Sequence, residues 1–262
     1  MNIAEYHSGE GVSRSDLRLI LRSPAHYKAA KEAPQEETKA MLIGSAFHCL
    51  TLEPELFPRR YVVAPDGLDR RTKEGKEAWA SFESEAAGKK VLKQEDYEAA
   101  EKMAQAIQEH PLGGRLVNGG EAEKSVFWET STGNGQVLCK CRPDYIKALR
   151  GSTVIVDLKS TEDARPEAFG KSSWNYGYHM QAAFYMDGLS ATLGPVGAFL
   201  FIVVEKHPPY AVAVYQASDQ MIDAGRKQYM NALEVYAECT AKDVWPAYPQ
   251  EIQELWLPGW AV

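Results

Sequence analysis

Apolar residues in the first 120 positions recur at the three- and four-residue spacing of amphipathic helices. Residues 11–23 predict a helix that Ser13 caps, and the Ser23-Pro24 pair ends it and begins another. The same spacing predicts later helices over 37–52, 74–87 and 94–109. Residues 60–64 read as a short strand, and the polar residues 65–76 form either a loop over a substrate groove or an ordinary surface loop.

From residue 121 the pattern changes to the period of two that is typical of strands. Residues 122–129 alternate, Gly133-Asn134-Gly135 is a hairpin signal, and residues 136–146 read as the next strand. The β-branched run Thr153-Val154-Ile155-Val156 predicts a further strand after a turn at 150–152. The rest of the chain predicts a helix over 174–189, strands over 197–204 and 210–216, a long helix over 218–241, and a tail over 245–262.

Three charged residues lie near these middle strands. Asp157 and Lys159 share one face of their strand, and Asp144 lies on one face of the segment before it. If the two strands are neighbours, the two carboxylates meet at one end of a sheet, where their repulsion calls for a cation such as Mg²⁺ or Mn²⁺. Asp157 follows an apolar run directly, where a charge needs a partner. The alternative is that these are surface charges at strand ends.

Other side chains have two interpretations each. His48 lies among apolar residues of its helix and is either a core histidine or a ligand. Glu121 and Glu123 share a strand face, and either is a third acid near the metal or an edge charge. Another set recurs at spacings of three and four on one helical face, where it either packs in the core or orients a phosphate or the attacking water: Tyr178, Gln181 and Tyr185.

Composition and charge limit the function classes. The chain has 262 residues, 45% of them hydrophobic and 25% charged, which is typical of a soluble globular protein. It has no apolar run long enough to span a membrane and no signal peptide at residues 1–9. The four cysteines form no Cys-x-x-Cys pair, which argues against zinc or an iron–sulfur cluster and fits the reducing cytoplasm.

The net charge of −7 counts against nucleic-acid binding, although a local basic groove can still hold DNA. Arg14, Arg18 and Arg22 recur every four residues on one helical face. They form either a solvated face or a stripe that contacts DNA phosphates.

Pro143-Asp144 and Asp157-Leu158-Lys159 together match the PD-(D/E)XK signature of metal-dependent nucleases. The chain as a whole resembles exodeoxyribonuclease VIII, the RecE-type recombination exonucleases of prophages. The matching segments run nearly from end to end: Glu5-Tyr6-His7, Ser13-Arg14-Ser15, residues 44–50, residues 52–55, residues 141–144, residues 157–161, residues 178–185, Trp245-Pro246 and Leu257-Pro258.

This resemblance implies a mixed α/β fold, with the central mixed sheet of a PD-(D/E)XK nuclease core flanked by helices and an N-terminal helical segment. It implies a single nuclease domain over residues 1–262. Within it, residues 1–120 are mainly helical, residues 121–217 hold the catalytic sheet and helix, and residues 218–262 form a C-terminal helix and tail.

The resemblance also implies roles for single residues. Lys159 would hold and polarise the attacking water or the scissile phosphate. Mg²⁺ is the expected cofactor, with Mn²⁺ as a second possibility. The implied metal ligands are His48, Asp144, Asp157 and the backbone carbonyl of Leu158. The implied lining residues of the site are Glu123, Gln181 and Tyr185.

The implied activity is 5′-to-3′ digestion of linear double-stranded DNA to mononucleotides, which leaves a 3′ single strand. A RecT-type annealing protein would use that strand, and the exonuclease itself would form a ring, most simply a tetramer. Two alternatives remain open. One is an endonuclease of the restriction or repair type on the same core, and the other is a DNA-end-binding protein without catalysis.

Overall fold

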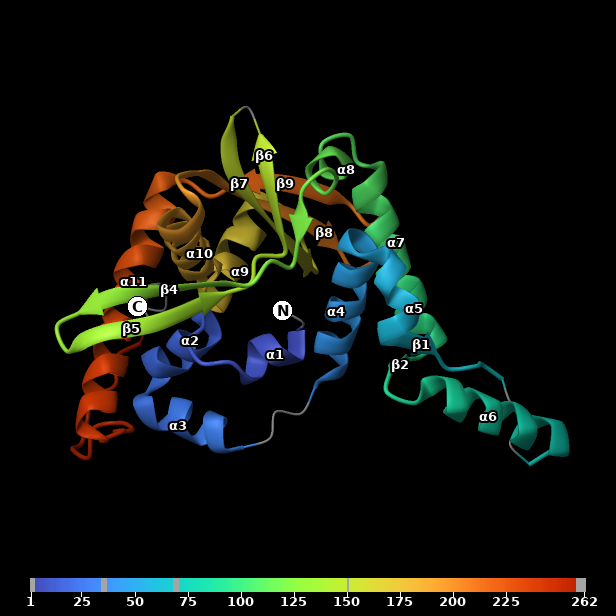
Figure 1. The fold of residues 1–262 in the computed structure, drawn as a ribbon, viewed down its shortest axis with the longest axis horizontal. Coiled ribbons are helices and arrows are strands. Elements are labelled where there is room, and N and C mark those ends of the chain that lie inside the picture. The colour runs from blue at the N-terminus through green and yellow to red at the C-terminus, as the bar shows by residue number, and fades with distance from the viewer. Residues whose placement is uncertain (1–2, 34–36, 68–70, 150, 258–262) are drawn as a thin grey trace.

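The computed structural model describes residues 3–33, 37–67, 71–149 and 151–257 (Figure 1). Its helices are α1 (Ile3–Ser8), α2 (Arg14–Arg22), α3 (Pro24–Glu32), α4 (Lys39–Leu52), the 3₁₀ turn η1 (Pro54–Leu56), α5 (Phe57–Arg60), α6 (Lys73–Ala86), α7 (Gln94–Glu109), α8 (Gly113–Leu116), α9 (Pro166–Tyr176), α10 (Tyr178–Leu193) and α11 (Asp219–Lys242). Its strands are β1 (Tyr61–Val63), β2 (Lys90–Leu92), β3 (Glu121–Ala122), β4 (Val126–Thr132), β5 (Gly135–Cys141), β6 (Tyr145–Leu149), β7 (Ser152–Thr161), β8 (Val196–Glu205) and β9 (Val212–Gln216).

The central sheet is mixed, as the predicted fold class requires. In the described part of the chain its strand order is β3-β6-β7-β8-β9. Strands β7 and β8 are parallel, and the other neighbouring pairs are antiparallel. The β6–β7 register pairs Tyr145 with Val156, so Asp144, which directly precedes β6, comes level with Asp157. The predicted approach of the two carboxylates at one end of the sheet is therefore confirmed.

Apolar side chains cover both faces of this sheet, and helices pack on each (Figure 1). Ile155 and Phe201 face the core formed with α10 and α11. Val156 and Leu158 face the core formed with α4 and α7. Because side chains alternate along β7, Asp157 points to the same face as Ile155, which α10 covers.

Hydrogen bonds join the N-terminal segment that holds α1 to α3 to the β4–β5 hairpin. The backbone of Val12 exchanges hydrogen bonds with β5, donating to the Leu138 carbonyl at 2.8 Å and accepting from the Lys140 N–H at 2.9 Å. The Lys140 ammonium also donates to the carbonyls of Tyr6 and Gly9. These bonds hold the N-terminal helices opposite α4, across the middle of the molecule in Figure 1.

The helices predicted over 11–23, 37–52, 74–87 and 94–109 are confirmed to within three residues at each end. Ser13 accepts a hydrogen bond from the Asp16 N–H, and the Asp16 side chain accepts from the Ser13 N–H, so a full capping box starts α2. Among the helices that the structure describes, none is both long and apolar enough to cross a lipid bilayer. In the polar segment 65–76, residues 68–70 lie outside the described residues, and α6 already begins at Lys73.

The single strand predicted over 136–146 is wrong. Strand β5 ends at Cys141 and pairs with β4, whereas β6 begins at Tyr145 and pairs with β7. Pro143 has no N–H to give to a ladder, so the chain leaves one strand pair there and enters another. Asp144 therefore lies in a bend, and the face predicted for it by counting from β5 does not apply. In the predicted turn 150–152, residue 150 is outside the described residues and Gly151 has φ +79°.

Two further elements are interrupted. The strand predicted over 122–129 divides into β3 and β4, and Glu123 between them has φ +52°. The helix predicted over 174–189 is in fact the end of α9 and most of α10, because Gly177 adopts φ +68° and ends α9 in a left-handed cap. The tail packs on the body at Trp245, which contacts Tyr27, but the later tail residue Ile252 is fully exposed.

Candidate functional site

Asp144 is fixed at the point where β6 begins. One carboxylate oxygen accepts the backbone N–H of Leu158 on β7 at 2.7 Å. The other lies 3.5 Å from Nδ1 of His48, which α4 brings from the opposite side. Only 13% of the Asp144 side chain is exposed, so both contacts form in a largely desolvated environment.

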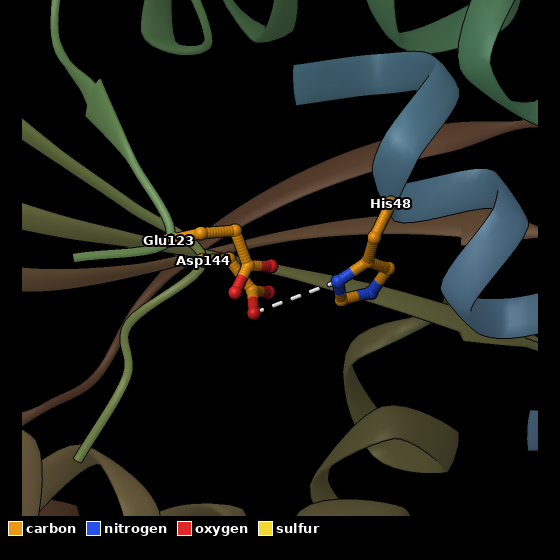
Figure 2. Close-up of side chains that lie close together, drawn as sticks. All are labelled: His48, Glu123 and Asp144. Carbon is orange, nitrogen blue, oxygen red and sulfur yellow. Dashed lines mark ion pairs between the residues drawn. The ribbon is translucent and has the colours of Figure 1, made fainter. Parts of the chain in front are cut away.

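His48, Glu123 and Asp144 form a cluster of possible metal ligands (Figure 2). One ligand atom from each lies within 4.8 Å of the others, and within the described ranges no other group of three or more His, Cys, Asp or Glu residues meets that condition. Figure 2 shows the two carboxylates on one side and the imidazole on the other, aimed at the same space. One nitrogen and two oxygen donors suit Mn²⁺ and are compatible with Mg²⁺.

Glu123 reaches this cluster through an unusual backbone. Its φ of +52° is the left-handed region, which costs a non-glycine residue free energy and needs support from its surroundings. The Glu123 N–H donates to the Asp144 carbonyl at 3.0 Å, and Arg142 donates from Nε to the Glu123 carboxylate at 2.8 Å. Arg142 also donates to the Ser125 hydroxyl at 2.6 Å. Glu121, the other acid considered for this role, is instead exposed and paired with Lys124 at 2.9 Å.

The electrostatics of the cluster reflect crowded charge in a desolvated place. Burial raises the pKa of Glu123, and the nearby Asp144 charge raises it further. Burial by itself would raise the pKa of Asp144. The nearby His48 and Lys159 have a larger and opposite effect, so the pKa of Asp144 lies below its usual range. Burial by itself would lower the pKa of His48, yet the Asp144 carboxylate raises it overall. A divalent cation would favour the ionised carboxylates and the neutral imidazole.

Asp157 is fully buried and lies beside this cluster without belonging to it. One of its oxygens accepts the Gln181 amide at 2.6 Å, and the other is paired with the Lys159 ammonium. Burial raises the pKa of Asp157 to about 6, and the charge of Asp144 contributes to that rise. The structure therefore brings the two aspartates into electrostatic contact, while the ligand atoms that converge most closely belong to Asp144, Glu123 and His48.

An open cleft of about 900 Å³ lies over these residues. Six of the eight residues proposed from the sequence line it: His48, Glu123, Leu158, Lys159, Gln181 and Tyr185. The spacing of Tyr178, Gln181 and Tyr185 does place all of them on the cleft face of α10. Leu158 donates its N–H to Asp144, and a ligand role for its carbonyl stays a prediction. Burial raises the pKa of Tyr185 well above its usual value.

Arg14 lines the cleft, although the sequence alone did not distinguish it from Arg18 and Arg22. Arg18 and Arg22 are exposed, but Arg14 points into the cleft and donates to the Gln181 side-chain oxygen at 3.2 Å. Arg14, Gln181 and Asp157 thus form a continuous hydrogen-bonded row. The even four-residue spacing of the three arginines gave no signal that one of them differs from the others.

The cleft is locally more basic than the whole chain. Its lining holds five lysines and arginines against three carboxylates, although the net charge of the chain is −7. The cations are Arg14, Lys31, Lys140, Arg142 and Lys159. The acids are Asp16, Glu37 and Glu123. Local potential, rather than net charge, decides whether a polyanion can approach such a surface.

A mixed sheet with helices on both faces and acids and a lysine at one end of its central strands is the arrangement of the PD-(D/E)XK class. The chain matches the family described as PDDEXK-like domain of unknown function (DUF3799) over residues 13–256, and it belongs to that family. No curated protein matches it in sequence.

Among the solved structures that match this chain are the following two. A crystal structure described as a "Putative exonuclease" from Eubacterium rectale superposes with a TM-score of 0.64 at 13% identity, covering 93% of this chain and 87% of the other. At that identity the likeness shows a common fold. The structure of SSO0001 gives a TM-score of 0.32 at 13% identity, covering 72% of this chain and 86% of the other, which is too low to support an argument.

Proposed function

We propose that the protein is a metal-dependent exodeoxyribonuclease that digests linear duplex DNA. The observation that carries this proposal is the convergence of His48, Glu123 and Asp144 within 4.8 Å beside Lys159, in a cleft with a basic lining. Family membership and the fold shared with the Eubacterium rectale protein support it.

The donor set fits a divalent cation because it combines two carboxylates with one imidazole nitrogen in a desolvated setting. When bound, such an ion would neutralise phosphate charge and lower the pKa of a coordinated water. Mg²⁺ is the proposed ion, and the imidazole donor makes Mn²⁺ an effective substitute. Asp157 would complete the site from beside the cluster.

Lys159 places a cation at the cleft, where negative charge grows on a phosphate during hydrolysis. Its partner Asp157 is itself held by the Gln181 amide, so the lysine is directed by a fixed carboxylate. Tyr185 lines the same wall and, because burial raises its pKa, stays a neutral hydrogen-bond donor for a phosphate oxygen.

The finer properties follow the resemblance to the RecE-type exonucleases. They are digestion from 5′ ends to mononucleotides, a 3′ single strand left for a RecT-type annealing protein, assembly as a ring of four chains, and a cytoplasmic location. The four free buried cysteines are compatible with a reducing compartment.

The test uses linear and covalently closed circular forms of one plasmid, with Mg²⁺, Mn²⁺ or a chelator. We expect release of mononucleotides from the linear form only, and none with the chelator. Lys159→Met should lose most of the activity, whereas Lys102→Met, on the exposed side of α7, should keep it. Cutting of the closed circle would show an endonuclease, and intact linear DNA under every metal condition would refute the proposal.

A further inference from the structure

A second cavity adjoins the cleft and has a different chemical character. It has a volume of about 590 Å³ and lies between α4 and α7 on one side and α9 and the end of β7 on the other. Tyr178 and Ser160 line both cavities, so the two spaces meet at these residues. A volume of this size is in the range of small-molecule sites.

An aromatic pair forms the junction. The rings of Tyr176 and Tyr178 stack with centroids 5.7 Å apart and planes at 29°. Lys159 lies over the Tyr178 ring, with Nζ 4.6 Å from its centroid. Tyr176 is 52% exposed, which leaves much of its ring available to another flat group. The stack therefore leads from the catalytic lysine into the second cavity.

The charges of this cavity are already compensated by its own neighbours. Glu162 pairs with Lys206 at 2.9 Å and with His207 at 3.3 Å. Asp96 pairs with Lys39 at 2.9 Å. Because these cations are engaged by carboxylates, the cavity is a poor place for a phosphate and a better one for a neutral group. Ser160 and Ser172 line it, and a serine hydroxyl can donate a hydrogen bond to or accept one from the polar edge of such a group.

We propose that this cavity receives the nucleobase of the terminal nucleotide, stacked on Tyr176, while the phosphate of that nucleotide stays beside Lys159. This rests on the proposed nuclease function and adds a base subsite to it. Stacking on an aromatic ring accepts every base, because each has a π-face, so the subsite would hold the nucleotide without selecting its sequence. The released mononucleotide would occupy the same place.

The test compares dAMP with deoxyribose 5-phosphate, which has the same phosphate and sugar but no base. Their dissociation constants are measured by titration calorimetry in Mg²⁺, with no cleavage involved. Wild type should bind dAMP about 5- to 150-fold more tightly, the range expected for one stacked base. Tyr176→Ala should bring that ratio close to one, and Tyr176→Phe should keep it.

Trp174→Ala is the matched control. Trp174 is also on α9 and 64% exposed, but it stacks on His179 and lines a different cavity, so the ratio should not change. Equal binding of the two ligands by wild type, or an unchanged ratio in Tyr176→Ala, would overturn the subsite. If the protein cuts no DNA but its preference for dAMP depends on Tyr176, the base subsite is upheld and the nuclease function is refuted. If the protein cuts DNA but binds the two ligands equally, the nuclease function is upheld and the base subsite is refuted.

Discussion

Arg14 offers a specific test of the site because its removal should lower activity strongly while changing stability little. Its guanidinium donates to Gln181 at 3.2 Å, but its buried Nε has no hydrogen-bond partner among the described residues. Burial lowers the pKa of Arg14, which shows that the surroundings disfavour its charge, although Tyr185 and Asp157 act in the other direction. A folded chain gains little by keeping a cation in such a place.

The expected loss of activity follows from the hydrogen-bonded row. With its oxygen held by Arg14, the Gln181 amide can present only its NH₂ group to Asp157, which it does at 2.6 Å. Arg14→Met keeps the aliphatic stem and removes the donor, so the amide can rotate. Losing a hydrogen bond to a charged group costs about 1.5–3 kcal/mol. If the same free energy of stabilisation is lost from the transition state, kcat/KM falls about 10- to 150-fold.

Stability should change far less. The same substitution removes an unpaired buried N–H, whose desolvation costs about 1–3 kcal/mol and offsets most of the lost bond. We therefore expect a free energy of unfolding within about 1 kcal/mol of wild type, measured by urea denaturation. Arg18→Met, one turn further along α2 and exposed, should change neither quantity. Full activity in Arg14→Met, or a large loss of stability with activity kept in the folded fraction, would refute the reasoning.

Three other outcomes are expected. Asp144→Asn should weaken Mn²⁺ binding at least about 10-fold by calorimetry, because it removes a charged donor. Unchanged affinity would show that the metal binds elsewhere. His48→Asn should weaken Mn²⁺ more than Mg²⁺, since nitrogen donors favour the transition metal, and equal losses would argue against a ligand role. Gly225→Ala would place a methyl group 2.1 Å from the His179 carbonyl and should destabilise by about 1–3 kcal/mol in urea, whereas Gly170→Ala meets nothing within 4 Å and should stabilise by about 0.5–1 kcal/mol.

The parts of the fold that could be predicted from sequence are those with a local cause. The α2 helix begins at Ser13 because the capping side chains are three residues apart. Strand β7 forms where β-branched residues follow one another, and its period of two correctly directs Asp157 toward the face that α10 covers. These are short-range effects, so one stretch of sequence contains the whole signal.

The interruptions were missed because the pattern continues through them. Apolar alternation runs past Pro143, and only the exchange of strand partners shows that β5 and β6 belong to different sheets. Tyr176 and Tyr178 lie in one apparently helical segment, yet Gly177 turns the chain and leaves one ring at the end of α9 and the other at the start of α10. A break between two stretches of similar composition has only a weak local signature.

The cluster of possible metal ligands shows a second limit of prediction from sequence, which is that its members lie far apart along the chain. His48 and Asp144 are 3.5 Å apart across two helix–sheet layers, and no spacing rule connects them. The sequence left two glutamates, Glu121 and Glu123, as alternatives for the third acid. The left-handed backbone of Glu123, which the sequence did not predict, brings that side chain to the cluster. Long-range contacts of this kind depend on how layers pack, which local periodicity does not encode.

The N-terminal helices are part of the site rather than a separate cover for it. Arg14 comes from α2, and α2 is held in place by Val12 on β5 and, through the neighbouring α3, by the Ala25 N–H, which donates to the Pro246 carbonyl of the tail at 3.1 Å. A fragment limited to the strands and α10 would keep Asp157 and Lys159 but lose both His48 and Arg14. The cluster of possible metal ligands and the hydrogen-bonded row would then each lack one member, so both depend on the N-terminal segment as well as on the central sheet and α10.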